Sequence, residues 1–456
     1  MIFGALAKHH LKLLMDHSMN PTRVSIAILS GAVLLSGLVL FSASDVRDWT
    51  APLKTEAERL GKASWHPMLK HLAEMHAHST HAPAAAFEFP WEDTGTGYGL
   101  GPAFGHWDLV HEVLDVLPAV PEHAREELLN DVRLQLASGL LPGLYWMNPA
   151  ANAGLRARFD PNNSHPPVWV VAAGEYLTRT GDQNLAREFF GHATRQLKWF
   201  ESSRKATPGG YLYHDILMPK WESGVDEGVR FDDRAKVKTN ACVDATSHVY
   251  QLATYAATWA TLIGEDPAPW TARANRLRDF IETKLWSEDD GFFFDSWAIE
   301  QPELKHQAFE GMWPVVVGAA SPAQAQRVID GWLLRSDRFF SEHPIATVGV
   351  RDPKFERRMW RGPAWNSMTY WAALGCVRYG RKDGARKLLE AALDDTAAQF
   401  ARTGTIWEFY DPQGRHPEDV ARKPQTKRNQ PFTEYLGHNP LFAMARLWQQ
   451  LASTPK

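Results

Sequence analysis

The stretch that decides the fold is CVDATSHVYQLATYAATWATLIG, residues 242–264, followed two residues later by PAPWTARANRLRDFIETKL, residues 267–285. In both segments apolar residues recur at the three- and four-residue spacing of a helix, and neither segment alternates strictly as a strand does. Because only Glu265 and Asp266 separate the two segments, we expect the two helices to lie antiparallel as a hairpin.

The same helical pattern recurs from residue 52 almost to the end of the chain. It predicts helices over 52–75, 105–117, 122–138, 166–180, 182–203, 242–264, 267–285, 304–319, 322–335, 362–380, 382–402 and 432–452. Long connections lead into every second helix, and connections of one to four residues lead out of it. Six hairpins joined in this way predict an all-α fold of two concentric rings, an (α/α)6 toroid, over residues 50–456. The long loops then gather at one rim, where a pocket opens.

An uncharged segment, VSIAILSGAVLLSGLVLFS, lies at residues 24–42, within a separate N-terminal part at 1–49. Basic residues precede it and acidic residues follow it, so the positive side is expected to stay in the cytoplasm: Lys8, Lys12, Arg23, Asp45 and Asp48. We expect a membrane anchor rather than a cleaved signal, because Phe41 stands where cleavage needs a small residue. A buried core helix is the alternative. An anchor in the inner membrane, or a signal, would place the domain outside the cytoplasm, in the periplasm or beyond.

The composition excludes several classes of protein. The formal net charge is −4 and no basic stripe is present to neutralise a run of phosphates, so nucleic acid is excluded as a partner. No zinc-protease, nucleotide-binding or serine-hydrolase motif occurs, and the two cysteines, Cys242 and Cys376, form no CxxC pair. We therefore expect no metal and no cofactor. The 19 tryptophans against 11 tyrosines indicate either core filling or flat rings that stack on sugars.

Polar and aromatic residues cluster in the long connections and at the helix starts that follow them. The clusters are GHWDLVHE at 105–112, SHPPVW at 164–169, KWESGVDEGVRFDD at 220–233, MWRGPAWN at 359–366, IWEFYDPQG at 406–414 and EYLGHNPL at 434–441. In the predicted toroid they all fall at the same rim. Tryptophans beside acidic residues, arginine and glycine in one mouth indicate a pocket for a small carbohydrate.

Two carboxylic acids in these clusters match what the cleavage of an acetal requires. One acid must protonate the leaving oxygen while a base activates water on the other face of the sugar. Asp226 and Glu408 lie on loops that enter opposed inner helices, which favours the wider spacing of an inverting enzyme. A general acid must hold its proton, so we expect a raised pKa for Asp226 and an ionised Glu408. Taken alone, Asp226 also fits a turn or helix cap, and Glu408 also fits a solvated loop.

Together the clusters resemble the inverting α-glycosidases of the (α/α)6 class, the glycoside hydrolase family 63-like group that includes mannosylglycerate hydrolase and processing α-glucosidase I and is related to trehalase. The resemblance runs from about Gly105 to about Leu441. It rests on Trp-Glu-Ser-Gly-x-Asp at 221–226, on WRGPxW at 360–365 and on EFYDPQG at 408–414. It implies an exo-acting enzyme for a small α-glucoside or α-mannoside, such as glucosylglycerate, mannosylglycerate, trehalose or a short α-oligosaccharide.

By the same resemblance, Asp226 is the general acid and Glu408 is the base. The residues that it assigns to substrate binding are Trp107, Asp108, His165, Trp221, Gly224, Asp244, Trp360, Arg361, Gly362, Trp365, Glu418 and His438. The chain departs from the family pattern after the acid, where Glu227 and Gly228 stand, and at two further positions, where His165 replaces a glutamine and Asn366 a proline. Such positions line the pocket entrance, so the departures bear on the identity of the released group.

Other functions would use similar sequence features. A sugar epimerase or isomerase of the same toroid fold works with histidines, for which the candidates are His106, His111, His165, His248 and His438. An inverting phosphorylase needs no base to activate water, which leaves Glu408 unexplained. A membrane-anchored carbohydrate-binding protein needs neither acid.

Overall fold

The computed structural model describes residues 49–84, 86–147, 162–207, 209–218, 221–423 and 429–453, all within one compact unit, Asp48–Lys456. The predicted anchor at 24–42 lies outside these residues, and the predicted division at residue 49 stays a prediction. Among the described helices, none is both long enough and apolar enough to cross a membrane.

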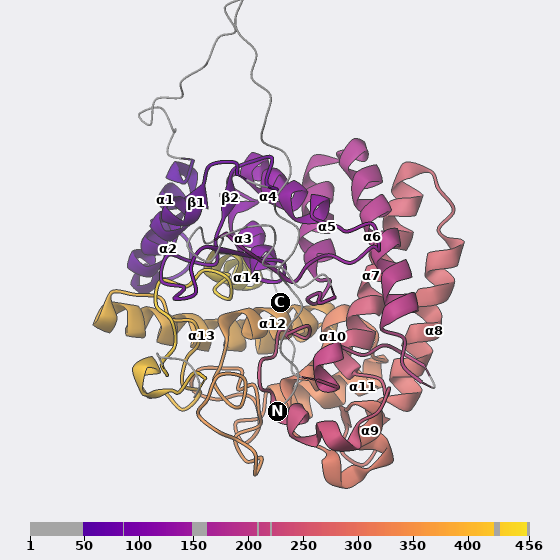
Figure 1. The fold of residues 1–456 in the computed structure, drawn as a ribbon. Helices are drawn as coiled ribbons and strands as arrows, with labels where there is room; N and C mark the ends of the chain where they lie inside the picture. Colours follow the sequence, from indigo (N-terminus) through magenta and orange to yellow (C-terminus); the bar gives the residue numbers. More distant parts are fainter. Residues whose placement is uncertain are drawn as a thin grey trace, which may run out of the picture. The chain divides into compact units, whose positions relative to one another are not determined.

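Six helices of the described residues form a closed inner ring. Each contacts the next one along the chain, and the last contacts the first: α3 (Asp108–Val116), α5 (Trp169–Thr180), α7 (Val243–Ile263), α10 (Trp313–Val317), α12 (Asn366–Arg378) and α14 (Leu441–Ser453). An outer set packs against them (Figure 1): α2 (His66–Ser79), α4 (Pro121–Arg133), α6 (Gln183–Ser203), α8 (Ala268–Lys284), α11 (Pro322–Val328) and α13 (Lys382–Thr403). The predicted (α/α)6 toroid is therefore confirmed.

The tight ends of the hairpins use glycine to stop one helix and a polar or proline residue to start the next. Helix α5 ends at Gly181 and α7 ends at Gly264, both in the left-handed region with φ of 65° and 79°, where a side chain would be strained. The side chain of Asp182 then accepts hydrogen bonds from the first turn of α6. These local signals explain why the short connections could be read from the sequence.

Two helices of the inner ring are shorter than predicted. The predicted helix over 432–452 begins only at Leu441, after Pro440, and the one over 304–319 is α10 preceded by the 3-10 turn η6 (Phe309–Met312). Proline is tolerated in the first turn of a helix, as Pro314 is in α10, and α10 ends at Gly318, whose φ of 81° is left-handed. The first predicted helix is divided into α1 (Ala51–Ala57), η1 (Ala63–Trp65) and α2.

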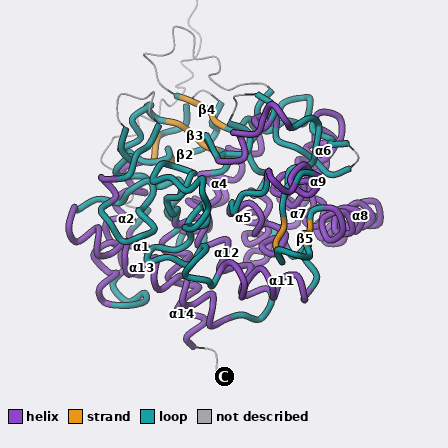
Figure 2. Tube along the Cα trace, turned by 90° about the horizontal axis from the view of Figure 1, so that it is seen from below, coloured by secondary structure: helices purple, strands orange, loops and turns teal. Residues whose placement is uncertain are grey.

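The long connections hold short strands and turns instead of further helices (Figure 2). Three antiparallel pairs occur among the described residues: β1 (Thr80–His81) with β2 (Trp91–Glu92), β3 (Ala103–Gly105) with β4 (Leu144–Trp146), and β5 (Trp286–Ser287) with β6 (Phe292–Phe293). The other short helices are η3 (His214–Ile216), η4 (Val229–Lys236), α9 (Ser296–Glu300), η5 (Pro302–Leu304), η7 (Ile329–Leu333) and η8 (Pro417–Asp419).

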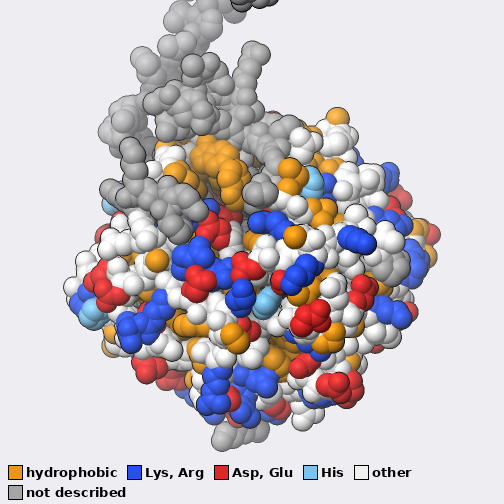
Figure 3. Space-filling model, turned by 60° about the horizontal axis from the view of Figure 1, so that its bottom comes forward, with side chains coloured by type: hydrophobic (Ala, Val, Ile, Leu, Met, Phe, Trp, Pro, Cys, Tyr) orange, Lys and Arg blue, Asp and Glu red, His pale blue; other side chains and the backbone are white. Residues whose placement is uncertain are grey.

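Charged side chains of both signs are mixed over the face drawn in Figure 3, outside its grey atoms. A nucleic-acid backbone is bound by a surface that gathers positive charge. No such gathering of positive charge is seen on the part of this face that the structure describes.

Candidate active site

One pocket gathers most of the predicted site residues. It has a volume of about 190 Å³ and is lined by Tyr98, Leu100, Trp107, Asp108, Leu144, Trp146, Asn163, His165, Trp221, Gly224, Asp226, Met359, Trp360, Trp365, Glu408, Arg422, Lys423, Tyr435 and His438. Each of the sequence clusters contributes at least one of these residues. Segments that are far apart in the chain therefore meet at one place, where the long loops enter the inner helices.

Three tryptophans form one wall of the pocket. The rings of Trp360 and Trp365 lie parallel with centroids 3.9 Å apart, and the ring of Trp107 lies nearly parallel to that of Trp360 at 5.8 Å. His438 meets all three rings edge-on. Trp360 is only 2% exposed, so this wall is also part of the hydrophobic core. Flat apolar faces of this kind suit the C–H faces of a sugar ring.

Gly224 allows the acid-bearing loop to approach this wall closely. Its φ is 72°, and a Cβ at this position would lie 2.0 Å from a ring atom of Trp107. No other residue type fits both the left-handed backbone and the indole contact. The glycine of the Trp-Glu-Ser-Gly-x-Asp motif is thus required by packing.

Glu222 of the same motif holds the loop in place and does not face the substrate. Its buried carboxylate accepts a hydrogen bond from Arg204 Nε at 2.7 Å, and backbone N–H groups of Ser164 and His214 donate to it at 3.2 and 2.5 Å. Glu222 therefore ties the segments that contain Ser164, Arg204 and His214 to the loop, four residues before Asp226. Arg204 was not identified from the sequence, because nothing near it in the chain marks it as a partner of this loop.

Asp226 lies in the pocket wall with its side chain 17% exposed. Its Oδ2 is paired with the ammonium group of Lys423. A neighbouring cation stabilises an ionised carboxylate, whereas a general acid works from its protonated form. A role as general acid would therefore require Asp226 to exchange its contact with Lys423 for one with a substrate.

Glu408 is buried and held by a cation on the same loop. Arg422 donates from Nε to Oε2 at 2.8 Å and from Nη2 to Oε1 at 2.9 Å, and the backbone N–H of Phe432 donates to Oε2 at 3.0 Å. A two-point pairing with arginine fixes both the orientation and the negative charge of a carboxylate. The environment of Glu408 therefore differs from that of Asp226.

A third carboxylate, Asp108, reaches the pocket from the first turn of α3. Its Oδ1 accepts a hydrogen bond from the Tyr435 hydroxyl at 2.9 Å, and Gly105 and Gly437 leave room for it, since a Cβ on either would lie 2.1 Å from its oxygens. Burial raises the pKa of Asp108 to about 6, and the charges of Glu408 and Asp226 act in the same direction. Asp108 is thus a hydroxyl acceptor that titrates near neutrality.

Three polar atoms in the pocket lining are buried and have no hydrogen-bond partner among the described residues: Trp107 Nε1, Asn163 Oδ1 and His165 Nδ1. Buried polar groups are rarely left unpaired, because each one costs about 1–3 kcal/mol. One donor, one acceptor and one imidazole nitrogen around an enclosed space suit the hydroxyl groups of a sugar. Asn163 precedes the SHPPVW cluster directly, and that position was its only indication in the sequence.

Asp244 lies outside the pocket lining, which corrects its predicted contact with the substrate. Arg230 donates to it from Nη2 at 2.6 Å, donates to Asp295 from Nη1 at 2.9 Å and places Nε 2.9 Å from Glu310. All four side chains are buried. Asp244 therefore anchors η4, the segment that follows Asp226, to the start of α7.

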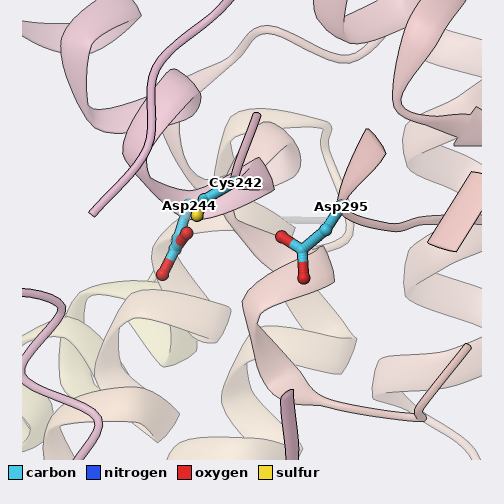
Figure 4. A group of neighbouring side chains, drawn as sticks. All are labelled: Cys242, Asp244 and Asp295. Carbon is cyan, nitrogen blue, oxygen red and sulfur yellow. The ribbon is translucent and has the colours of Figure 1, made fainter. Parts of the chain in front are cut away.

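Cys242, Asp244 and Asp295 converge in the arrangement of possible metal ligands, with ligand atoms within 4.8 Å of one another (Figure 4). The guanidinium of Arg230 already bridges the two carboxylates, and burial holds the pKa of the Cys242 thiol well above its usual range. A metal would need a thiolate and the place that Arg230 occupies. Arg230 and the two carboxylates therefore form an ion-paired anchor, with the Cys242 thiol beside it.

Three more predicted substrate contacts are placed elsewhere. The guanidinium of Arg361 is paired with Asp232 at 2.9 Å and with Glu356 at 2.8 Å, and so lies outside the pocket lining. The N–H of Gly362 donates to Thr347 Oγ1 at 3.0 Å and holds the WRGP turn. Glu418 pairs with Arg402 on α13, away from the pocket.

The histidines do not favour epimerase chemistry. His106 pairs with Asp131, His248 with the Tyr213 hydroxyl, and both nitrogens of His111 have partners, Gly437 O and the indole N–H of Trp371. Only His165 and His438 of this set line the pocket. Burial lowers the pKa of His165 to about 3 and that of His438 well below its usual range. An acid or base for proton exchange at neutral pH needs a pKa near 7.

The family model for the mannosylglycerate hydrolase MGH1-like glycoside hydrolase domain matches residues 102–419. This chain belongs to that family. It is therefore a glycoside hydrolase, and the matched region contains both Asp226 and Glu408. The family was expected from the sequence motifs, and the match confirms that expectation.

Individual relatives are distant, and their matches cover different shares of this chain. The mannosylglycerate hydrolase MGH1 of Selaginella moellendorffii is 22% identical over 389 residues, which cover 69% of this chain and 76% of the relative. The cytosolic neutral trehalase of Emericella nidulans is 28% identical over 204 residues, 43% of this chain and 25% of the trehalase. The crystal structure of the GH63 mannosylglycerate hydrolase from Thermus thermophilus in complex with Tris superposes with a TM-score of 0.63 at 18% identity, covering 83% of this chain and 99% of the other.

The Arg230 anchor predicts a stability that depends on pH. Burial raises the pKa of Asp295 to about 6 and that of Glu310 to about 7, so the folded state binds protons that the unfolded chain releases. The stability that the protonated Asp295 and Glu310 contribute is fully present below about pH 4 and is lost as the pH rises through 6 to 7. Arg230→Met should lower the free energy of unfolding by about 3–5 kcal/mol at pH 8, and by less at pH 5.

Urea unfolding at the two pH values measures this effect. Lys236→Met is the matched control on the same short helix, because its exposed ion pair with Asp233 contributes little at either pH. An equal loss for Arg230→Met at pH 5 and pH 8 would contradict the assignment.

From the raised pKa of Asp108 we expect kcat/KM to decrease on the acid side of its pH profile. Its raised pKa of about 6 means that it accepts sugar hydroxyls above pH 6 and is protonated below, so kcat/KM should fall as the pH drops through 6. Asp108→Asn should lower kcat/KM by roughly 10- to 100-fold and remove this limb. Tyr435→Phe removes a hydrogen bond that favours the ionised form, so its limb should move to higher pH. A limb that is unmoved in both variants would assign the titration to another group.

Proposed function

We propose that this enzyme hydrolyses small α-glycosides with inversion, using Asp226 as general acid and Glu408 as general base. The observation that carries the proposal is that two carboxylates in different environments line one small pocket beside a tryptophan wall. Asp226 reaches solvent and has an exchangeable ammonium partner, whereas Glu408 is buried and fixed by Arg422. Such a difference is what two carboxylates need in order to take opposite roles.

The bond changes in this mechanism balance without a cofactor. Asp226 gives its proton to the glycosidic oxygen as the bond from that oxygen to C1 breaks, and the aglycone leaves as an alcohol. Glu408 takes a proton from water, whose oxygen bonds to C1 on the opposite face of the ring. The product is a free sugar of inverted configuration. Asp226 then regains a proton from solvent, and Glu408 loses one to solvent.

The names of the relatives support a small substrate. One is a mannosylglycerate hydrolase and another a neutral trehalase, and the chain spans about three quarters of the former and one quarter of the latter. We therefore propose an α-glucoside or α-mannoside of one or two sugar units, cut from its non-reducing end. A panel of mannosylglycerate, glucosylglycerate, trehalose and short α-oligosaccharides would separate these candidates.

The two acids predict different responses to the leaving group. Asp226→Asn should lower kcat by about 10²- to 10⁴-fold for alkyl glycosides and far less for activated aryl glycosides, which leave without protonation. Glu408→Gln should lower kcat for both classes alike, because every substrate needs an activated water. Measuring kcat on both classes, with proton NMR of the fresh product, tests the assignment. Release of the α-anomer from an α-glycoside would show retention and overturn the inverting mechanism.

We further propose that residues 24–42 anchor or export the enzyme, so that it acts outside the cytoplasm. The support is the uncharged run and the basic residues before it. A phosphatase that is active only after export, fused behind residue 50, should be active in intact cells and remain in the membrane fraction. The same fusion lacking residues 24–42 should be inactive, and activity that survives this deletion would contradict the proposal.

A further inference from the structure

Four large apolar side chains of the described residues are exposed, and two of them line the pocket. The four are Leu100, Met218, Trp221 and Leu262, with exposures of 49%, 42%, 50% and 41%. Leu100 and Trp221 belong to the pocket lining, whereas Met218 and Leu262 do not. Single exposed apolar residues are common on proteins, but a group beside a binding pocket marks a surface for a ligand.

The fourth residue, Leu262, serves as a reference. It lies near the end of α7, about 27 Å along that helix from Asp244, at a rise of about 1.5 Å per residue. The start of α7 faces the rim loops, so Leu262 lies at the far end of the inner ring. It is as exposed as the mouth residues but has no place in the pocket.

The position of the acid decides which part of a substrate meets the mouth. A general acid protonates the leaving oxygen, so the released group must lie on the side of Asp226. Trp221 precedes Asp226 by five residues on the same loop, and both line the pocket. The indole of Trp221 packs edge-on against Trp146 with centroids 6.3 Å apart, which supports its ring from one side. The released group therefore passes the exposed side of Trp221.

The two cationic side chains of the described pocket lining are not placed to bind an anionic group of a substrate. Arg422 is paired with Glu408, and Lys423 is paired with Asp226. Each cation thus serves a proposed catalytic carboxylate, and a substrate carboxylate would have to compete for it. The polar atoms Asn163 Oδ1 and His165 Nδ1, together with Asp108, suit the sugar, while Leu100 and Trp221 suit an apolar group.

We propose that the mouth formed by Leu100, Trp146 and Trp221 is a binding site for an apolar aglycone, an alkyl or aryl group of several carbon atoms. This inference rests on the proposed function, because it uses Asp226 to orient the substrate. Each methylene group that the mouth covers should raise kcat/KM by up to about fourfold. An aglycone as small and charged as glycerate gains nothing from this surface.

The test is a series of n-alkyl α-glycosides from methyl to octyl, in the glucose and the mannose configuration, each below its micelle concentration. In the unaltered enzyme kcat/KM should rise with chain length by at least about tenfold from methyl to octyl. Trp221→Ala and Leu100→Ser should each reduce the ratio of octyl to methyl glycoside. Leu262→Ser, equally exposed but remote, should leave both the ratio and the methyl rate unchanged.

The outcomes separate this inference from the proposed function. Hydrolysis of the methyl glycoside with a flat chain-length series would overturn the apolar mouth and leave the hydrolase intact. If no glycoside of the series were hydrolysed, the proposed function would be overturned. Calorimetric affinities of Glu408→Gln for the same series would then show whether the mouth binds apolar chains. A rise that persists unchanged in Trp221→Ala and Leu100→Ser also overturns it, since the chain would bind elsewhere.

Discussion

The site depends on one buried cation. Arg230 joins Asp244 at the start of α7, Asp295 before α9 and Glu310 in η6, and it lies four residues after Asp226. A buried arginine that lost these partners would be strongly destabilising, and so would the carboxylates without the arginine. The loop that carries the acid is therefore fixed to the inner ring by charge as well as by packing.

On the other side of Asp226 the same loop is fixed by Glu222 and Gly224. The Glu222 carboxylate accepts hydrogen bonds from Arg204 and from two backbone N–H groups, and Gly224 lets the indole of Trp107 pack directly against the backbone. Between these anchors Asp226 is left partly exposed with an ammonium partner that it can exchange. Rigid supports on both sides and one accessible carboxylate are what a general acid requires, because proton transfer depends on geometry before it depends on acidity.

Glu408, in contrast to the partly exposed Asp226, is buried. Its oxygens accept hydrogen bonds from Arg422 and from the Phe432 N–H, which fix the orientation of the carboxylate. The tryptophan wall lies in the same pocket lining as both acids and belongs to the core as much as to the pocket. The tryptophans of this wall thus fill the core and at the same time present their rings to the pocket.

The sequence by itself determined the helical hairpins, the two rings and the motifs that bring Asp226 and Glu408 to the pocket, because helix periodicity, short turns and contiguous motifs are local properties. It could not distinguish Asp108, which faces the pocket, from Asp244, which holds Arg230, since both are acidic residues at the start of an inner helix. Only the tertiary structure decided which polar side chains line the pocket. Their counterions come from distant segments, as with Arg361 and Asp232, and a charge that has found such a partner no longer faces the pocket.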